Sequence, residues 1–342
     1  MGDTAALFTT PAPQLGRRAA EALVRDRFRI AGMARRLTSE RDLNFRITTD
    51  DGRDYVLKVA NAAEARDVLD FQARALAHVS AADPDLPVPR VVRTPEGAEV
   101  VEAEGSLVRL LTWLDGTMLH AVERTPALRG SLGVIHARLG LALKGFSHPA
   151  ADHVLLWDLK GASGLRSLLR HVRDAEPRAL AERALARFEA RAAALPNLRT
   201  QVIHNDLNFH NVVVATGDPE QVAGILDFGD MVRSPLVCDV AVAAAYHVRA
   251  DERPLADAAE YLAAYHAVSP LRDEELEVLG DLIATRLAMS VLISGWRAAE
   301  HPQNRDYILR NEPAARAGLQ AFQRLSADEA TGILRRACGG RP

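Results

Sequence analysis

The sequence is poor in cysteine, which excludes the small folds that depend on disulfide bridges or structural zinc. Its 342 residues include two cysteines, Cys238 in an apolar segment and Cys338 in the glycine-rich tail. Two cysteines so far apart supply neither a disulfide framework nor the ligand spacing of a zinc site. The hydrophobic fraction of 48% predicts a fold stabilised by an ordinary apolar core. At this length we expect two lobes with a cleft between them.

The chain also lacks an excess of basic charge and any long apolar stretch. Lysine and arginine together number 42, against 45 aspartates and glutamates, which gives a formal net charge of −3. This balance does not favour a surface that neutralises nucleic-acid phosphates or anionic lipids. No apolar run reaches the length of a membrane span, and no basic start followed by an apolar core opens the chain. We expect a cytoplasmic protein, a monomer or homodimer, that binds small molecules and neither nucleic acid nor membrane.

The first third of the chain predicts a small lobe built on an antiparallel sheet. Helical spacing of apolar residues in 17–30 is followed by segments with strand character, and Asp50-Asp51-Gly52 favours a hairpin turn between the first two of them. The predicted strands are 44–48, 55–59, 99–103 and 107–113. Helical spacing in 62–79 predicts one inserted helix. We assign residues 1–113 to this lobe and place Lys58 on its second strand.

The remaining residues, 114–342, predict a larger and mainly helical lobe. The predicted helices are 128–143, 163–172, 178–195, 236–248, 255–267, 274–299 and 313–325. The exception is 202–230, where the short apolar runs 212–214 and 222–226 flank Gly217-Asp218-Pro219 and predict a small hairpin. The fold class is therefore α+β.

Polar residues at the ends of this second hairpin have the spacing of a phosphoryl-transfer site. Asp206 lies five positions before Asn211, and Asp227 follows sixteen positions later in Asp227-Phe228-Gly229. Phosphoryl transfer needs a carboxylate that accepts the proton of the attacking hydroxyl, and oxygen ligands that hold Mg²⁺ against the phosphates. We predict Asp206 as the catalytic base and Asn211 and Asp227 as the metal ligands. His204 is predicted to brace the loop by hydrogen bonding.

Lys58 supplies the remaining chemistry, because a lysine on a strand of the first lobe can neutralise nucleotide phosphates. Taken alone, a lysine on a strand is more often a solvated residue at a sheet edge, and an Asp-Phe-Gly segment is more often an ordinary turn. The occurrence of both in the right order, together with 204–211, favours a phosphoryl-transfer site.

Three further segments carry a family resemblance: 37–45 (LTSERDLNF), 227–236 (DFGDMVRSPL) and 294–297 (SGWR) with Pro302 and Asn304. With them, the chain resembles the aminoglycoside phosphotransferase and choline kinase superfamily over about residues 20–325. Within it, the chain is most similar to hydroxylysine kinases and to the kinase domains joined to aminotransferases in bacterial bifunctional proteins.

The resemblance implies a protein-kinase-like fold, with ATP or GTP as phosphoryl donor and Mg²⁺ as cofactor. It implies a catalytic loop at 204–211, a metal-binding segment at 227–230 and a hinge at 111–116, where backbone groups of Thr112 and Leu114 reach the purine base. It also implies that Asp239 holds the catalytic loop.

Two departures from the protein-kinase pattern leave alternatives open. The segment before Lys58 has Ser39-Glu40-Arg41-Asp42 where a glycine-rich loop would approach the phosphates, so Ser39 or Asn44 is the candidate substitute. The helix position that would supply a glutamate to the lysine holds Gln72, with Asp70 and Glu64 nearby, so the partner of Lys58 stays open.

The acceptor site is expected in the C-terminal helices, 274–325. Arg297 is a candidate for pairing with a carboxylate, and Asp230 or Trp296 for an ammonium group. Asn208 is a candidate for contacting the acceptor hydroxyl. The same spacings also fit ordinary core and surface positions.

The leading hypothesis is a kinase of a hydroxylated amino acid or amine, with 5-hydroxylysine first by resemblance. The alternatives are homoserine, choline, ethanolamine or an aminoglycoside, although the arginines in 286–316 disfavour a polycationic acceptor. An alternative of another class is a catalytically silent nucleotide-binding protein.

Overall fold

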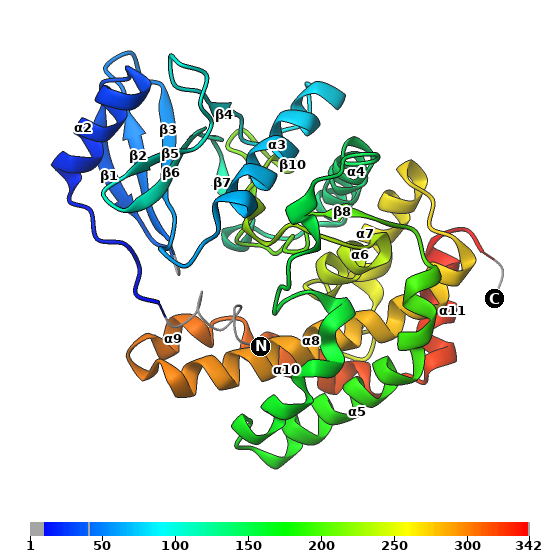
Figure 1. Ribbon diagram of the computed structural model, residues 1–342. Coiled ribbons are helices and arrows are strands. Elements are labelled where there is room, and N and C mark those ends of the chain that lie inside the picture. The colour runs from blue at the N-terminus through cyan, green and yellow to red at the C-terminus, as the bar shows by residue number, and fades with distance from the viewer. Residues whose placement is uncertain (1–9, 40–41, 341–342) are drawn as a thin grey trace.

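The protein consists of a small lobe built on an antiparallel sheet and a larger, mainly helical lobe (Figure 1). The computed structural model describes residues 10–39 and 42–340, so Glu40 and Arg41 of the segment before Lys58 lie outside the described residues. The α+β class predicted from the sequence is confirmed.

A six-stranded antiparallel sheet forms the small lobe, with the order β1-β2-β3-β6-β4 and with β5 paired to β6. The strands are β1 Met33–Leu37, β2 Leu43–Thr48, β3 Asp54–Val59, β4 Val91–Val92, β5 Val101–Ala103 and β6 Ser106–Thr112. One face buries Phe45, Leu57 and Leu110 against helix α2 (Arg17–Phe28). The other face carries Lys58 toward the second lobe.

The inserted helix, α3 (Arg66–Ala82), begins four residues later than predicted from the sequence. Asn61 ends the preceding segment in a turn, because its side-chain oxygen accepts a hydrogen bond from the Ala63 amide (2.9 Å). Helix α3 also links the lobes. Asp83, which follows it, accepts two hydrogen bonds from the Arg138 guanidinium of the large lobe, at 2.9 and 2.8 Å.

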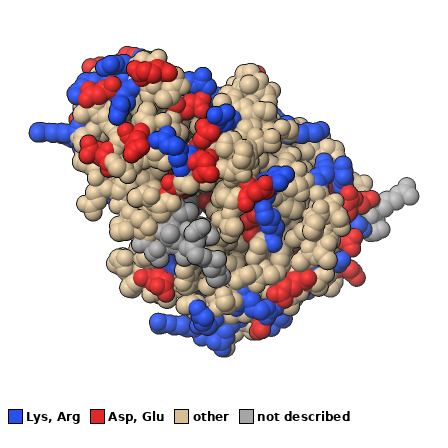
Figure 2. Space-filling model, in the orientation of Figure 1, with Lys and Arg blue, Asp and Glu red and all other residues tan. Residues whose placement is uncertain are grey.

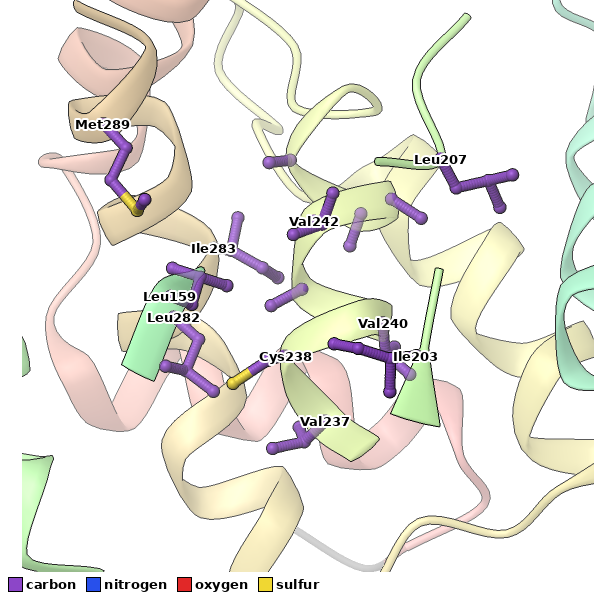
Figure 3. Packing of buried hydrophobic residues seen from close by; sticks show 14 of the residues in the cluster. Leu159, Ile203, Leu207, Val237, Cys238, Val240, Val242, Leu282, Ile283 and Met289 are labelled. Atoms are coloured by element: carbon purple, nitrogen blue, oxygen red, sulfur yellow. The ribbon is translucent and has the colours of Figure 1, made fainter. Parts of the chain in front are cut away.

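The large lobe is assembled around one long buried helix, α8. Its helices are α4 Pro126–Ala142, α5 Ala175–Arg191, α6 Leu236–Ala245, α7 Ala256–Val268, α8 Asp273–Glu300, α9 Arg305–Ile308, α10 Glu312–Phe322 and α11 Ala327–Ala337. Figure 3 shows Cys238 of α6 beside Leu282 of α8, and Val240 of α6 beside Ile203, which ends the strand Thr200–Ile203. This core supports the strands that carry the polar motifs.

The helix predicted at 163–172 is present as a 3-10 helix, Leu159–His171, rather than as an α-helix. Gly161 and Gly164 lie in this segment, and glycine disfavours a continuous α-helix. Helices α9 and α11 were not predicted from the sequence.

Two small sheets interrupt the helices and hold the motif loops. The hairpin of β9 (Val212–Ala215) and β10 (Asp218–Ile225) is joined by β7 (Thr117–Met118), and β8 (Thr200–Ile203) pairs with β11 (Val232–Pro235). Loop 204–211 therefore runs from β8 to β9, and loop 226–231 runs from β10 to β11. Both loops connect the same two sheets, which brings the motifs together.

Gly133 of α4 offers a test of the packing in the large lobe. A Cβ atom there would overlap the Tyr261 carbonyl oxygen and lie 2.9 Å from the Tyr265 amide nitrogen of α7. Gly133→Ala is expected to lower the free energy of unfolding by about 1–3 kcal/mol, because the two helices must separate. Gly130→Ala is the matched control, since a Cβ at Gly130 meets nothing within 4 Å and alanine favours a helix. Urea unfolding of both variants measures the difference, and equal stabilities would contradict this packing.

No helix in the ranges 10–39 and 42–340 is long and apolar enough to cross a bilayer. On the face seen in Figure 2, basic and acidic side chains are interspersed over both lobes. Cytoplasmic location and the monomer or homodimer state stay predictions.

Candidate active site

A cavity of about 590 Å³ lies between the sheet and the helical lobe. Most residues proposed from the sequence line it: Ser39, Asn44, Lys58, Asp206, Asn208, Asn211, Asp227, Asp230 and Arg297. His204, Thr112, Leu114 and Trp296 are not among its lining residues. The cavity therefore brings together side chains from both lobes that lie far apart in the sequence.

Asp206 lines the cavity, and both of its carboxylate oxygens accept hydrogen bonds. Its Oδ2 accepts hydrogen bonds from Asn211 Nδ2 at 2.7 Å and from Asn208 Nδ2 at 3.0 Å. Its Oδ1 accepts one from Arg286 Nη2 at 3.1 Å. Burial raises the pKa of Asp206 to about 7, Asp230 adds to the rise, and Arg286 opposes it. A carboxylate fixed in this way and titrating near neutrality is suited to accept a proton from a hydroxyl.

His204 lies behind this loop and forms hydrogen bonds to its backbone and to the neighbouring strand end. Its Nδ1 accepts a hydrogen bond from the Asp206 amide at 3.2 Å, so Nε2 carries the proton and donates to the Leu226 carbonyl at 3.0 Å. Burial lowers the pKa of His204, which favours this neutral ring. One imidazole thus connects the loop of Asp206 to the strand that leads to Asp227.

Asp239, at the start of α6, fixes the same loop through its backbone. Its carboxylate accepts hydrogen bonds from the amides of Asn205 (2.7 Å) and His204 (3.3 Å) and lies 3.0 Å from His136 Nε2. Asn205 has a φ of 65°, in the left-handed region that asparagine tolerates better than most residues. Asp239 thus has the role that the family resemblance implied.

Lys58 Nζ donates to Asp227 Oδ1 at 3.0 Å, which answers the open question of its partner. Gln72, at the position of the expected helix glutamate, donates instead to the Gly229 carbonyl at 3.1 Å and so braces the Asp227-Phe228-Gly229 segment. Asp70 pairs with Arg74 and His148. Asp227 itself has a φ of 54°, which turns the chain sharply where β10 ends.

The oxygen donors present fit Mg²⁺. The Asn211 amide nitrogen donates to Asp206, so its oxygen is the atom left to face a cation, and the Asp227 carboxylate is half exposed. Within the described part of the chain, no three His, Cys, Asp or Glu side chains gather to form a complete metal cage. Mg²⁺ in kinases is typically held by one or two protein side chains together with phosphates and water.

Ser39 and Thr112 are already engaged in local hydrogen bonds. The Ser39 hydroxyl donates to the Asp42 carbonyl. The Thr112 amide donates to the Arg90 carbonyl at 2.9 Å. Contacts of Thr112 and Leu114 with a purine base stay predictions.

The cavity is also lined by an arginine of the helical lobe that was not predicted from the sequence. Arg286 of α8 is 2% exposed, donates to Asp206, and stacks 4.6 Å from the centre of the Trp157 ring. The sequence does contain a signal for this residue, because Arg286 is the one charged residue in the apolar segment 282–293. An arginine buried in such a segment usually has a specific partner. Arg297 is also buried at the cavity, whereas Trp296 packs against the hydrophobic core.

Comparisons with known proteins agree with this geometry. Residues 34–277 match the family described as "Phosphotransferase enzyme family". Hydroxylysine kinase from Mus musculus is 28% identical over 318 residues, covering 84% of this chain and 83% of that protein. Homoserine kinase from Methylobacillus glycogenes is 29% identical over 235 residues, covering 68% and 69%.

Among solved structures, a microcompartment-associated aminopropanol kinase superposes with a TM-score of 0.69 at 18% identity, covering 92% of this chain and 98% of that one. An aminoglycoside phosphotransferase from Alicyclobacillus acidocaldarius superposes with a TM-score of 0.59 at 18% identity, covering 96% of each chain. These likenesses confirm the protein-kinase-like fold.

Proposed function

The chain belongs to the phosphotransferase enzyme family, and from this premise we propose that it transfers the γ-phosphoryl group of ATP or GTP to the hydroxyl of a small amino acid. 5-Hydroxylysine is the leading acceptor. The observation that carries the proposal is the Asp206 carboxylate, held at both oxygens in the cavity that also contains Lys58 and Asp227.

The proposed reaction is a direct in-line transfer. Asp206 orients the acceptor hydroxyl and takes its proton as the oxygen attacks the γ-phosphorus. The bond from that phosphorus to the bridging oxygen breaks, and the nucleoside diphosphate leaves. Lys58 neutralises phosphate charge from the sheet. Asn211 and Asp227 would hold Mg²⁺, which would supply further neutralisation of the phosphate charge.

The acceptor is proposed to carry a carboxylate and an ammonium group. Arg297 is buried at the cavity and can receive the carboxylate, while Asp230, also buried there, can receive the ammonium group. Asn208 lies next to Asp206 and can contact the reacting hydroxyl. Two relatives are named for hydroxylated amino acids, hydroxylysine and homoserine, which supports the same class.

A parallel screen tests this proposal. Purified protein is incubated with ATP or GTP, Mg²⁺ and one acceptor from hydroxylysine, homoserine, threonine, choline, ethanolamine and aminoglycosides, and nucleoside diphosphate release is measured. A hydroxylated amino acid is expected to give the strongest signal. A stronger signal with choline or an aminoglycoside would contradict the acceptor class. Nucleotide binding without turnover of any acceptor would favour a catalytically silent protein.

A further inference from the structure

We propose that Arg109 is a second cationic ligand of the nucleotide phosphates and acts beside Lys58. Asn44, Lys58 and Arg109 form a polar row across three neighbouring strands of the sheet. The inference rests on the proposed kinase function and concerns the nucleotide half of the cavity, which has no glycine-rich loop.

The pairing register of strands β2, β3 and β6 brings the three residues of the row side by side. Lys58 of β3 lies opposite Asn44 of β2 on one side and opposite Arg109 of β6 on the other. Residues directly opposite each other on antiparallel strands point to the same face. All three line the cavity, whereas their strand neighbours Leu57 and Leu110 point into the small-lobe core.

The Arg109 guanidinium is buried and has no bonded anionic partner among the residues that the structure describes. The side chain is 4% exposed, and burial lowers the pKa of its guanidinium. No hydrogen bond or ion pair joins this guanidinium to a residue in 10–39 or 42–340; Asp42, Glu64 and Asp227 attract it only through longer-range Coulombic interactions. Two cations directly opposite in a sheet repel each other, and a buried charge without a bonded anion is costly. An anionic ligand between Lys58 and Arg109 removes both costs.

The chemistry of the row fits phosphate oxygens. A guanidinium presents a planar fork of donors that matches a phosphate. Lys58 already shares its charge with Asp227, so a second cation is needed to balance a polyphosphate. Asn44 is also incompletely satisfied, because its buried side-chain oxygen accepts no hydrogen bond within the described residues. The row thus supplies from side chains what a glycine-rich loop supplies from its backbone.

Direct binding measurements test the role of Arg109 without an acceptor. The native chain, Arg109→Met and Arg109→Lys are titrated calorimetrically with ATP, ADP and AMP in Mg²⁺, and with the guanine series in parallel. Arg109→Met is expected to weaken binding of the tri- and diphosphate by about tenfold or more, with little effect on the monophosphate. Arg109→Lys is expected to restore part of the loss. Arg35→Met, on the exposed outer strand of the same sheet, is the matched control.

The outcomes separate this role from a structural one. Native affinity for the triphosphate in a folded Arg109→Met protein would overturn the proposal, as would equal weakening of all three nucleotides. If Arg109→Met does not fold, native triphosphate affinity in Arg109→Gln overturns the proposal in the same way. If the native chain binds no nucleotide, both this proposal and the kinase function fail, whereas nucleotide binding without acceptor turnover contradicts the kinase function alone.

Discussion

Replacing Asp206 with asparagine is expected to lower kcat by a factor on the order of 10²–10⁴, the usual contribution of a general base. The amide keeps the shape of the side chain but cannot accept the proton of the acceptor hydroxyl. Nucleotide affinity should stay close to native, because Asp206 faces the acceptor side beside Arg286. The measurement is the steady-state rate of nucleoside diphosphate release at saturating nucleotide and acceptor.

Asp26→Asn is the matched control for this experiment. Asp26 lies exposed on α2, where its ion pair is with the neighbouring Arg25, so its substitution should leave kcat unchanged. The thermal midpoint of each variant is measured alongside, to separate lost chemistry from lost folding. Native turnover in a well-folded Asp206→Asn protein would refute the assignment of the base.

The grouping of polar side chains in loop 204–211 could be predicted from the sequence because its geometry is local. Asn211 reaches the Asp206 carboxylate from five positions along the same loop. The contact between Lys58 and Asp227 spans 169 positions, and the spacing of motifs alone left the partner of Lys58 open. The preferred site for a lysine partner, on α3, is occupied by Gln72, which braces Gly229 instead.

Residues that reach the cavity through tertiary packing were harder to predict. Arg286 lies 80 positions from Asp206 and meets it only because α6 and α8 pack together beneath the loop. Trp296, by contrast, lies beside Arg297 in the sequence but packs against the core, since neighbouring positions on a helix point in different directions. Helical spacing therefore singled out Arg297, which lines the cavity, but it did not separate Arg297 from Trp296 and did not identify Arg286.

Replacing Asp239 with asparagine is expected to lower the free energy of unfolding by about 3–5 kcal/mol, because one partner of a buried polar cluster is removed. The carboxylate accepts from the Asn205 amide at 2.7 Å and lies 3.0 Å from His136 Nε2. An asparagine nitrogen would face one of these donors and leave it unsatisfied. Urea unfolding measures the loss, and Asp251→Asn, an exposed aspartate paired with Arg249, is the control.

Acid sensitivity gives a second signature of Asp239. Burial raises the pKa of Asp239, but His136 and the Asn205 amide outweigh burial and hold this pKa below its usual value. Its contribution to stability is therefore complete above the pKa of an unfolded aspartate, about 3.9, and is lost as pH falls through the lower folded-state pKa. Asp239→Asn should remove this part of the acid dependence and also reduce kcat, since the amides that Asp239 holds position the loop of Asp206. An unfolding midpoint and kcat equal to native would show that the loop keeps its conformation without this carboxylate.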